Sequence, residues 1–151
     1  MVWLCSLALF PPVLGTAEAQ NSTLQQRLAA ATSVTCAFTS LATATWEGAP
    51  GATIAPVTLE VAFVNVNADE GSAEAGNALG RSPVVVRASN DYLHLMQLFS
   101  AGPLYTTTVI AKETKDGRLM AVHTRHEYTL VSMPGFTSRP EMYLGTCTIA
   151  S

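Results

Sequence analysis

The sequence predicts an all-β fold of about eight antiparallel strands with one short N-terminal helix. Two observations lead to this prediction. From Ser33 onward, most segments are rich in Val, Thr, Leu and aromatic residues, and their apolar residues alternate more often than they recur at helical spacing. Short groups of Gly, Pro, Asn and Asp separate these segments. Such spacing suits hairpin turns and leaves no room for the helices that connect parallel strands.

The first nineteen residues predict a secretory signal peptide. The apolar run over residues 3–14 is too short to span a bilayer, and Ala17-Glu18-Ala19 before Gln20 matches an A-x-A cleavage site. No Lys or Arg precedes the run, so a short buried N-terminal element is the alternative. We expect residues 1–19 to be the signal peptide and residues 20–151 to be a single β-barrel domain. The mature chain is expected to lack a membrane span and to be exported, either periplasmic or extracellular.

Export also bears on the cysteines. Cys5 falls within the predicted signal peptide, which leaves Cys36 and Cys147 as an even pair. In an oxidising compartment such a pair favours a disulfide, with two separate buried thiols as the alternative. A disulfide that closes a loop of about 100 residues stabilises a fold by roughly 4–5 kcal/mol, because it lowers the conformational entropy of the unfolded chain. The bond would also place the first and last strands side by side.

A helix is expected over residues 21–31, with Ser22 as its N-terminal cap and Leu24 and Leu28 on one face. Strands are expected, in chain order, over residues 33–46, 57–63, 84–86 and 92–99, in the two runs of residues 104–128, and over residues 142–149. Residues 65–83 are rich in Gly, Ala and Asn. They predict a long loop, a candidate lid over a site, with a weak strand over residues 72–76 as the alternative.

The predicted disulfide favours one architecture. In an up-and-down meander, the first and last strands touch only if the sheet closes on itself, and eight strands enclose a packed interior or one small ligand. We therefore expect a closed up-and-down barrel, lipocalin/avidin-like in architecture. A Greek-key β-sandwich is the alternative, because it also brings terminal strands together.

Residues 104–128 form the clearest hairpin, with residues 115–118 (Lys-Asp-Gly-Arg) as its turn. A two-residue turn would place Thr107 opposite His126, whereas a three-residue loop would place Thr106 there. One face of the second strand carries Met120, Val122, Thr124, His126 and Tyr128, and the other carries Leu119, Ala121, His123, Arg125 and Glu127. Because the first set is the more apolar, we expect it to face inward.

This assignment defines two candidate sites. The first is a ligand site at the mouth of the barrel, formed by His126, Tyr128, Tyr105 and Thr107, with the histidine as polar anchor and the tyrosines as walls. A core histidine hydrogen-bonded to a threonine is the alternative for His126. The second is a surface recognition face formed by His123, Arg125 and Glu127, with a solvated network as the alternative.

Composition narrows the function classes. Charged residues make up 13% of the chain, its net charge is −3, and no basic cluster occurs, so nucleic-acid binding is not expected. His123 and His126 would point to opposite sides of a strand, which disfavours a shared metal. No G-x-S-x-G elbow occurs. We expect no catalytic residue, metal or cofactor, and a non-enzymatic barrel that binds a small apolar or amphipathic ligand. A protein-interaction or inhibitor module of the envelope is the alternative.

The combination of TTTV, DGRLMAVHTRHEY and SRPEMYLGTC resembles small exported bacterial proteins of no assigned function, over roughly residues 93–147. That resemblance implies no activity. Cysteines near both ends of the mature chain also make it similar to periplasmic lysozyme-inhibitor barrels, which are small and disulfide-closed. Their Ser-Ala-Ser-Gly motif is absent from this sequence, so no inhibitor function is carried over.

Overall fold

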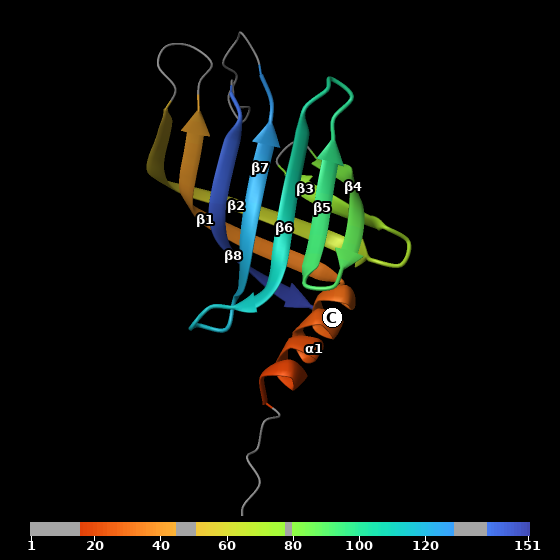
Figure 1. The fold of residues 1–151 in the computed structure, drawn as a ribbon. Coiled ribbons are helices and arrows are strands. Elements are labelled where there is room, and N and C mark those ends of the chain that lie inside the picture. The colour runs from red at the N-terminus through yellow and green to blue at the C-terminus, as the bar shows by residue number, and fades with distance from the viewer. Residues whose placement is uncertain (1–15, 45–50, 78–79, 129–138) are drawn as a thin grey trace, which may run out of the picture.

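The computed structural model describes residues 16–44, 51–77, 80–128 and 139–151. Within these residues one helix precedes eight strands (Figure 1). The elements are α1 (Thr16–Ala29), β1 (Ser33–Ala44), β2 (Ala52–Asn67), β3 (Ser72–Asn77), β4 (Gly80–Ser89), β5 (Tyr92–Leu98), β6 (Leu104–Glu113), β7 (Leu119–His126) and β8 (Glu141–Ala150).

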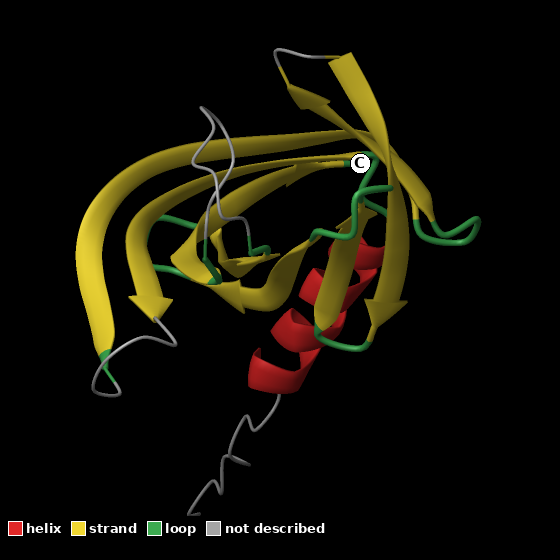
Figure 2. Ribbon diagram, turned by 90° about the horizontal axis from the view of Figure 1, so that it is seen from above, coloured by secondary structure: helices red, strands yellow, loops and turns green. Residues whose placement is uncertain are grey.

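The eight strands form a single closed sheet. Each strand pairs antiparallel with the next one in the chain, and β1 also pairs with β8. Seen from above, the strands curve around a shared interior (Figure 2). The predicted closed up-and-down barrel is therefore confirmed, and the β-sandwich alternative is wrong.

A disulfide joins the two strands that close the barrel. Cys36 of β1 lies directly opposite Cys147 of β8, and the two sulfur atoms are bonded. Both residues are fully buried. The predicted pairing is confirmed, and the bond links the first strand to the last at the seam of the sheet.

The interior is apolar at the end of the barrel where α1 lies (Figure 1). The largest fully buried apolar side chains there are Leu28, Phe38, Phe63, Leu93 and Leu95. On β2 the predicted core face is confirmed, because its alternate residues pack on this cluster, namely Val57, Leu59, Val61 and Phe63. Filling this end with side chains leaves the opposite end of the interior as the place for polar groups.

Helix α1 begins at Thr16, earlier than predicted, so Ser22 lies within the helix and is not its cap. Leu28 and Ala31 are buried in the core, and Leu24 packs against it. Two polar contacts add to this packing. Gln25 Nε2 donates to Asp91 Oδ1 at 2.7 Å, and the pair Arg27–Glu113 is 3.2 Å apart. α1 also includes the expected cleavage site, and the signal peptide stays a prediction.

The lid predicted over residues 65–83 is wrong. β2 continues to Asn67, and β3 and β4 fill most of the segment, so the weak-strand alternative was the better one. Asn67 Oδ1 accepts hydrogen bonds from the backbone amides of Asp69 and Glu70, at 3.1 and 3.0 Å, which shapes the β2–β3 turn. Gly71 completes this turn with φ of 72°. Pairing on both sides of β3 overrides the weak strand preference of its small residues.

Among the described residues, no helix has the length and apolar character needed to cross a membrane.

Candidate functional site

The β6–β7 hairpin differs in register from both predictions. Next to the turn, Glu113 pairs with Leu119, as the three-residue loop requires, but the pairing then shifts at an irregularity between Val109 and Glu113. Beyond that shift His123 lies opposite Thr107, and neither threonine lies opposite His126. The irregularity therefore decides which residues of the two strands meet.

The predicted faces of β7 are reversed. His123 is 1% exposed and Glu127 is also buried, while His126 is exposed and Tyr128 is 61% exposed. His126 and Tyr128 thus lie outside the interior, and the predicted ligand site is wrong for these two residues. The outward recognition face of His123, Arg125 and Glu127 is wrong for the same reason. Tyr105 and Thr107 are buried and do face inward.

The error has a physical cause on the outside of the barrel. Met142 and Leu144 of β8 are 43% and 49% exposed, and they pair with Thr124 and Val122 of β7. The outer face of these strands is thus uncharged and partly apolar, whereas the inner face of β7 carries Arg125. The rule that the more apolar face of a strand points inward therefore assigns the wrong face of β7 to the interior.

The inward residues of β5 to β8 form successive layers of cross-strand partners. The layer next to the end opposite α1 consists of Gln97, Tyr105, Arg125 and Glu141, and we call it the polar layer. The layer beneath it consists of Leu95, Thr107, His123 and Tyr143, and the next consists of Leu93, Val109, Ala121 and Gly145. The interior therefore changes from apolar to polar along the barrel axis.

His123 connects the polar layer to the layer beneath it. Its Nδ1 lies 2.8 Å from Thr107 Oγ1, and its Nε2 lies 3.3 Å from Arg125 Nε. An arginine nitrogen can only donate, so Nε2 is the acceptor and the proton of the neutral ring is on Nδ1. Burial, together with the positive charge of Arg125, lowers the pKa of His123 to about 4. At neutral pH the ring is therefore uncharged, and Nδ1–H donates to the threonine.

This tautomer bears on catalysis. A histidine that activates a hydroxyl nucleophile must accept the hydroxyl proton. In this structure the ring nitrogen next to Thr107 already carries a proton, so His123 is not placed to activate it. The pair instead orients the imidazole and, through it, Arg125.

Arg125 is held by aromatic rings on both neighbouring strands. Its guanidinium carbon Cζ lies 5.0 Å from the ring centroid of Tyr105 and 5.3 Å from that of Tyr143. These are cation–π distances. Phe38 lies deeper, with its ring centroid 5.5 Å from that of His123. The guanidinium is thus enclosed by rings at its sides and by an imidazole below.

The carboxylates near Arg125 are engaged elsewhere. The Tyr105 hydroxyl donates to Glu127 Oε2 at 2.5 Å, and the Tyr143 hydroxyl donates to Glu141. Burial is the main cause that raises the pKa of both tyrosines, with the carboxylates adding to it, and the pKa of Tyr143 reaches about 12. Both hydroxyls therefore stay protonated as donors well above neutral pH.

As a result, Arg125 has no ion pair within the described part of the chain. The three ion pairs found there are Arg27–Glu113, Arg81–Glu74 and Arg118–Asp116. Its one side-chain hydrogen bond to a described residue uses Nε, which leaves both terminal nitrogens without such a partner. A planar cation with fixed orientation and two available donors is suited to bind an oxyanion.

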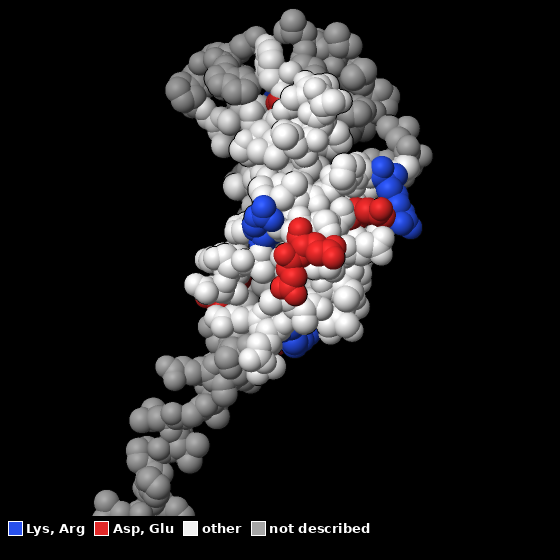
Figure 3. All heavy atoms as spheres, turned by 90° about the vertical axis from the view of Figure 1, so that its right-hand side faces the viewer, with Lys and Arg blue, Asp and Glu red and all other residues white. Residues whose placement is uncertain are grey.

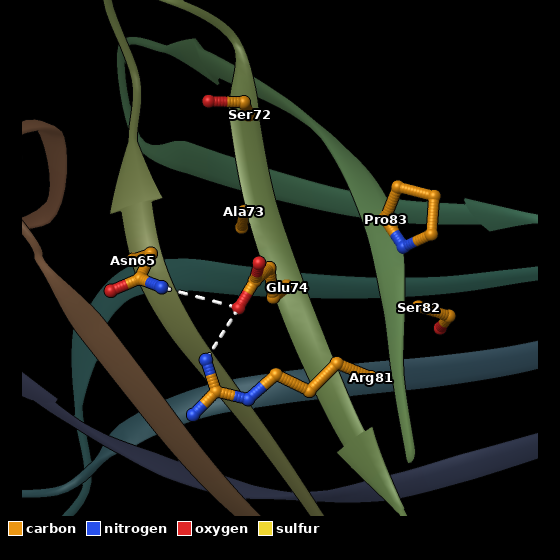
Figure 4. A pocket seen from close by; sticks show the side chains of 7 residues that line it. All are labelled: Asn65, Ser72, Ala73, Glu74, Arg81, Ser82 and Pro83. Atoms are coloured by element: carbon orange, nitrogen blue, oxygen red, sulfur yellow. Dashed lines mark hydrogen bonds and ion pairs between the residues drawn. The ribbon is translucent and has the colours of Figure 1, made fainter. Parts of the chain in front are cut away.

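A hollow of about 350 Å³ lies over β2, β3 and β4. It is lined by Asn65, Ser72, Ala73, Glu74, Arg81, Ser82 and Pro83 (Figure 4). The Glu74 carboxylate accepts hydrogen bonds from Arg81 at 2.7 Å and from Asn65 at 3.2 Å. Figure 3 shows that acidic and basic side chains also lie beside one another over the middle of the face drawn there. The charges of Glu74 and Arg81 in this hollow are thus paired, whereas Arg125 has no ion pair with another described residue.

Sequence reasoning missed Glu141, Tyr143 and Gln97 as site residues. For the first two, the sequence held part of the signal, because they share one face of β8 with Cys147, and the structure shows that Cys147 is buried. Alternation along β8 then places Tyr143 and Glu141 on the same side. No described group of three or more His, Cys, Asp or Glu side chains is arranged to hold a metal ion.

Fold and site together define a class: a closed eight-stranded antiparallel barrel, packed with apolar side chains at one end and carrying an inward polar layer at the other. Comparisons with protein-family models, with curated proteins and with solved structures found no significant match.

Proposed function

We propose that this protein is a non-enzymatic, exported β-barrel that binds a small amphipathic ligand against its polar layer. The observation that carries the proposal is the placement of Arg125. Its guanidinium faces the interior between Tyr105 and Tyr143, yet no described carboxylate pairs with it. A partly buried charge is costly to maintain unless something neutralises or uses it.

The residue directly opposite Arg125 on the neighbouring strand adds support to this proposal. Glu141 occupies the directly opposite position on β8, where an ion pair would form most easily. Its carboxylate instead accepts the Tyr143 hydroxyl. The acid is thus turned toward the tyrosine, and no described residue occupies the terminal nitrogens of the arginine.

The packing of the interior supports one location for the ligand. Beneath the polar layer, large apolar residues such as Phe38, Leu93 and Leu95 are fully buried. A ligand would therefore contact the polar layer from the side away from α1, with its polar group directed toward Arg125. This favours an amphipathic ligand over the purely apolar one that the sequence also allowed.

The disulfide supports the proposed export. Stable disulfides form mainly in oxidising compartments outside the cytosol, and the Cys36–Cys147 bond joins the strands that close the barrel. The predicted signal peptide leads to the same location. A periplasmic or extracellular barrel would meet its ligand in an aqueous environment.

Native mass spectrometry of protein purified from its host tests the proposal, together with displacement of a solvatochromic dye. We expect a co-purifying small-molecule adduct or saturable dye binding, either of which Arg125→Gln should reduce at least tenfold. Arg118→Gln is the matched control, because Arg118 pairs with Asp116 on the exposed hairpin turn. Absence of both an adduct and dye binding would overturn the proposal, as would equal effects of the two variants.

A further inference from the structure

We propose that the group recognised by Arg125 is a carboxylate of the ligand, held by the two terminal nitrogens of the guanidinium. This inference rests on the proposed function and narrows it to one ligand chemistry. It follows from the orientation of the guanidinium, from the charges around it, and from the fit between a planar fork and a planar acid.

The orientation is set by His123. Because Nε donates to His123 Nε2, that edge of the guanidinium faces the layer beneath and is occupied. One terminal nitrogen shares this edge with Nε, whereas the outer edge, formed by both terminal nitrogens, is turned away from it by the fixed geometry of the guanidinium. The Tyr105 and Tyr143 rings lie close to the guanidinium carbon. A ligand atom therefore reaches Arg125 most readily at its terminal edge.

A carboxylate matches that edge. Its two oxygens accept two parallel hydrogen bonds from a guanidinium in one plane, a geometry that a hydroxyl or single carbonyl cannot reproduce. The rings of Tyr105 and Tyr143 hold the plane of Arg125, so little side-chain entropy remains to be lost on binding. The site thus prefers a flat, bidentate acceptor.

The surrounding charges limit the ligand to one negative charge. Glu127 and Glu141 lie close enough to hydrogen-bond the two tyrosines that contact Arg125, and His123 is neutral at pH 7. A dianion such as a phosphate monoester would meet two carboxylates with a single cation to compensate them. A monoanion keeps the attraction of Arg125 with less of this repulsion.

An ammonium ligand is the main competitor, because the same two carboxylates would attract it. The structure favours the carboxylate for one reason. Both glutamates already accept hydrogen bonds from tyrosine hydroxyls, the one to Glu127 being 2.5 Å long, whereas the terminal nitrogens of Arg125 have no described partner. An amine would share each glutamate with a tyrosine hydroxyl, whereas a carboxylate would meet donors that have no partner among the described residues.

The test uses three probes with the same eight-carbon chain, namely octanoate, octanol and octylamine. Their affinities for the oxidised, full-length wild-type protein are measured at pH 7 by calorimetry. We expect octanoate to bind at least tenfold more tightly than either of the others. This comparison needs no variant, so it does not depend on whether a mutant folds.

Variants then assign the preference to one residue. Arg125→Gln should bind octanoate no more tightly than octanol, and Arg125→Lys should keep part of the preference, because it retains the charge but loses the fork. Arg118→Gln should keep the full preference. Far-ultraviolet circular dichroism and the melting temperature of each variant show whether the barrel is intact.

Each outcome has a distinct meaning. Equal binding of octanol and octanoate, or tighter binding of octylamine, would overturn the carboxylate inference while leaving a ligand-binding barrel in place. A preference for octanoate that survives in Arg125→Gln would also overturn it. Failure of every probe to bind would contradict the inference, and with no native adduct and no dye binding it would contradict the proposed function as well.

Discussion

Arg125 Nε donates a hydrogen bond to Nε2 of His123, two residues earlier on the same strand and 3.3 Å away. In a β-strand, residues separated by two point to the same side of the sheet, and because His123 is buried, this side is the interior of the barrel. The contact also requires the histidine to accept, and therefore to be neutral when the arginine is bound to it. One bond thus sets the tautomer of His123 and the orientation of the arginine.

The first prediction concerns pH. The pKa of His123 is lowered from 6.5 to about 4 by burial and by Arg125, while in the unfolded chain it returns to its ordinary value. The contribution of His123 to the free energy of unfolding is therefore fully present above pH 6.5 and is lost as the pH falls toward 4. A shift of this size corresponds to at most about 3 kcal/mol. Urea unfolding of the wild type between pH 7 and pH 4 should show this loss.

A matched pair of variants isolates the contribution of His123. His123→Gln retains a polar side chain that does not titrate, so its unfolding free energy should fall less steeply over the same pH range. His126→Gln is the control, because His126 is exposed on the outer face. Equal pH slopes in the wild type and His123→Gln would show that His123 does not titrate with a lowered pKa.

The second prediction concerns Gly145, which lies where β8 passes closest to β1. A Cβ at this position would lie 2.1 Å from the Ala37 carbonyl oxygen and 2.6 Å from Phe38 Cα. Both atoms belong to the backbone, so relief would require the seam of the barrel to move. We expect Gly145→Ala to lower the free energy of unfolding by about 1–3 kcal/mol, as overpacking of a core does. Chemical denaturation at neutral pH measures the change.

Gly76→Ala on β3 is the control for that experiment. A Cβ at Gly76 would meet no atom within 4 Å, so the change should alter the free energy of unfolding by no more than about 0.5 kcal/mol. A Gly145→Ala protein as stable as Gly76→Ala would contradict the close approach of β8 to β1.

The third prediction concerns the disulfide. Replacing both Cys36 and Cys147 by Ala should lower the free energy of unfolding by about 2–5 kcal/mol, because the unfolded chain regains the freedom of a long loop. The measurement is urea unfolding of the double variant beside the oxidised and the reduced wild type. The reduced wild type, which keeps both buried sulfur atoms, controls for lost side-chain packing. If all three proteins unfold at the same urea concentration, the bond does not stabilise the barrel.

Several features could be read without the structure because they depend on local patterns and on one covalent constraint. Alternation identified the core face of β2 from Val57 to Phe63, and the cysteine pair implied that β1 and β8 are neighbours. Closure was then the favoured architecture, since a meander with adjacent ends must close on itself, and the sandwich was the alternative. The segment over residues 65–83 was harder, because its strands consist of small residues that only sheet pairing holds extended.

The sequence by itself predicted the all-β class, about eight strands and the disulfide, and it favoured a closed barrel over a sandwich. The tertiary structure alone decided which face of β7 is inside. Strand alternation has a period of two, so it separates the faces but cannot orient them when each contains apolar residues. On β7 the outward Val122 packs beside Leu144, while the inward Arg125 is stabilised by Tyr105 and Tyr143 from neighbouring strands. That stabilisation exists only once β6 and β8 have paired with β7, and so no pattern within β7 could reveal it.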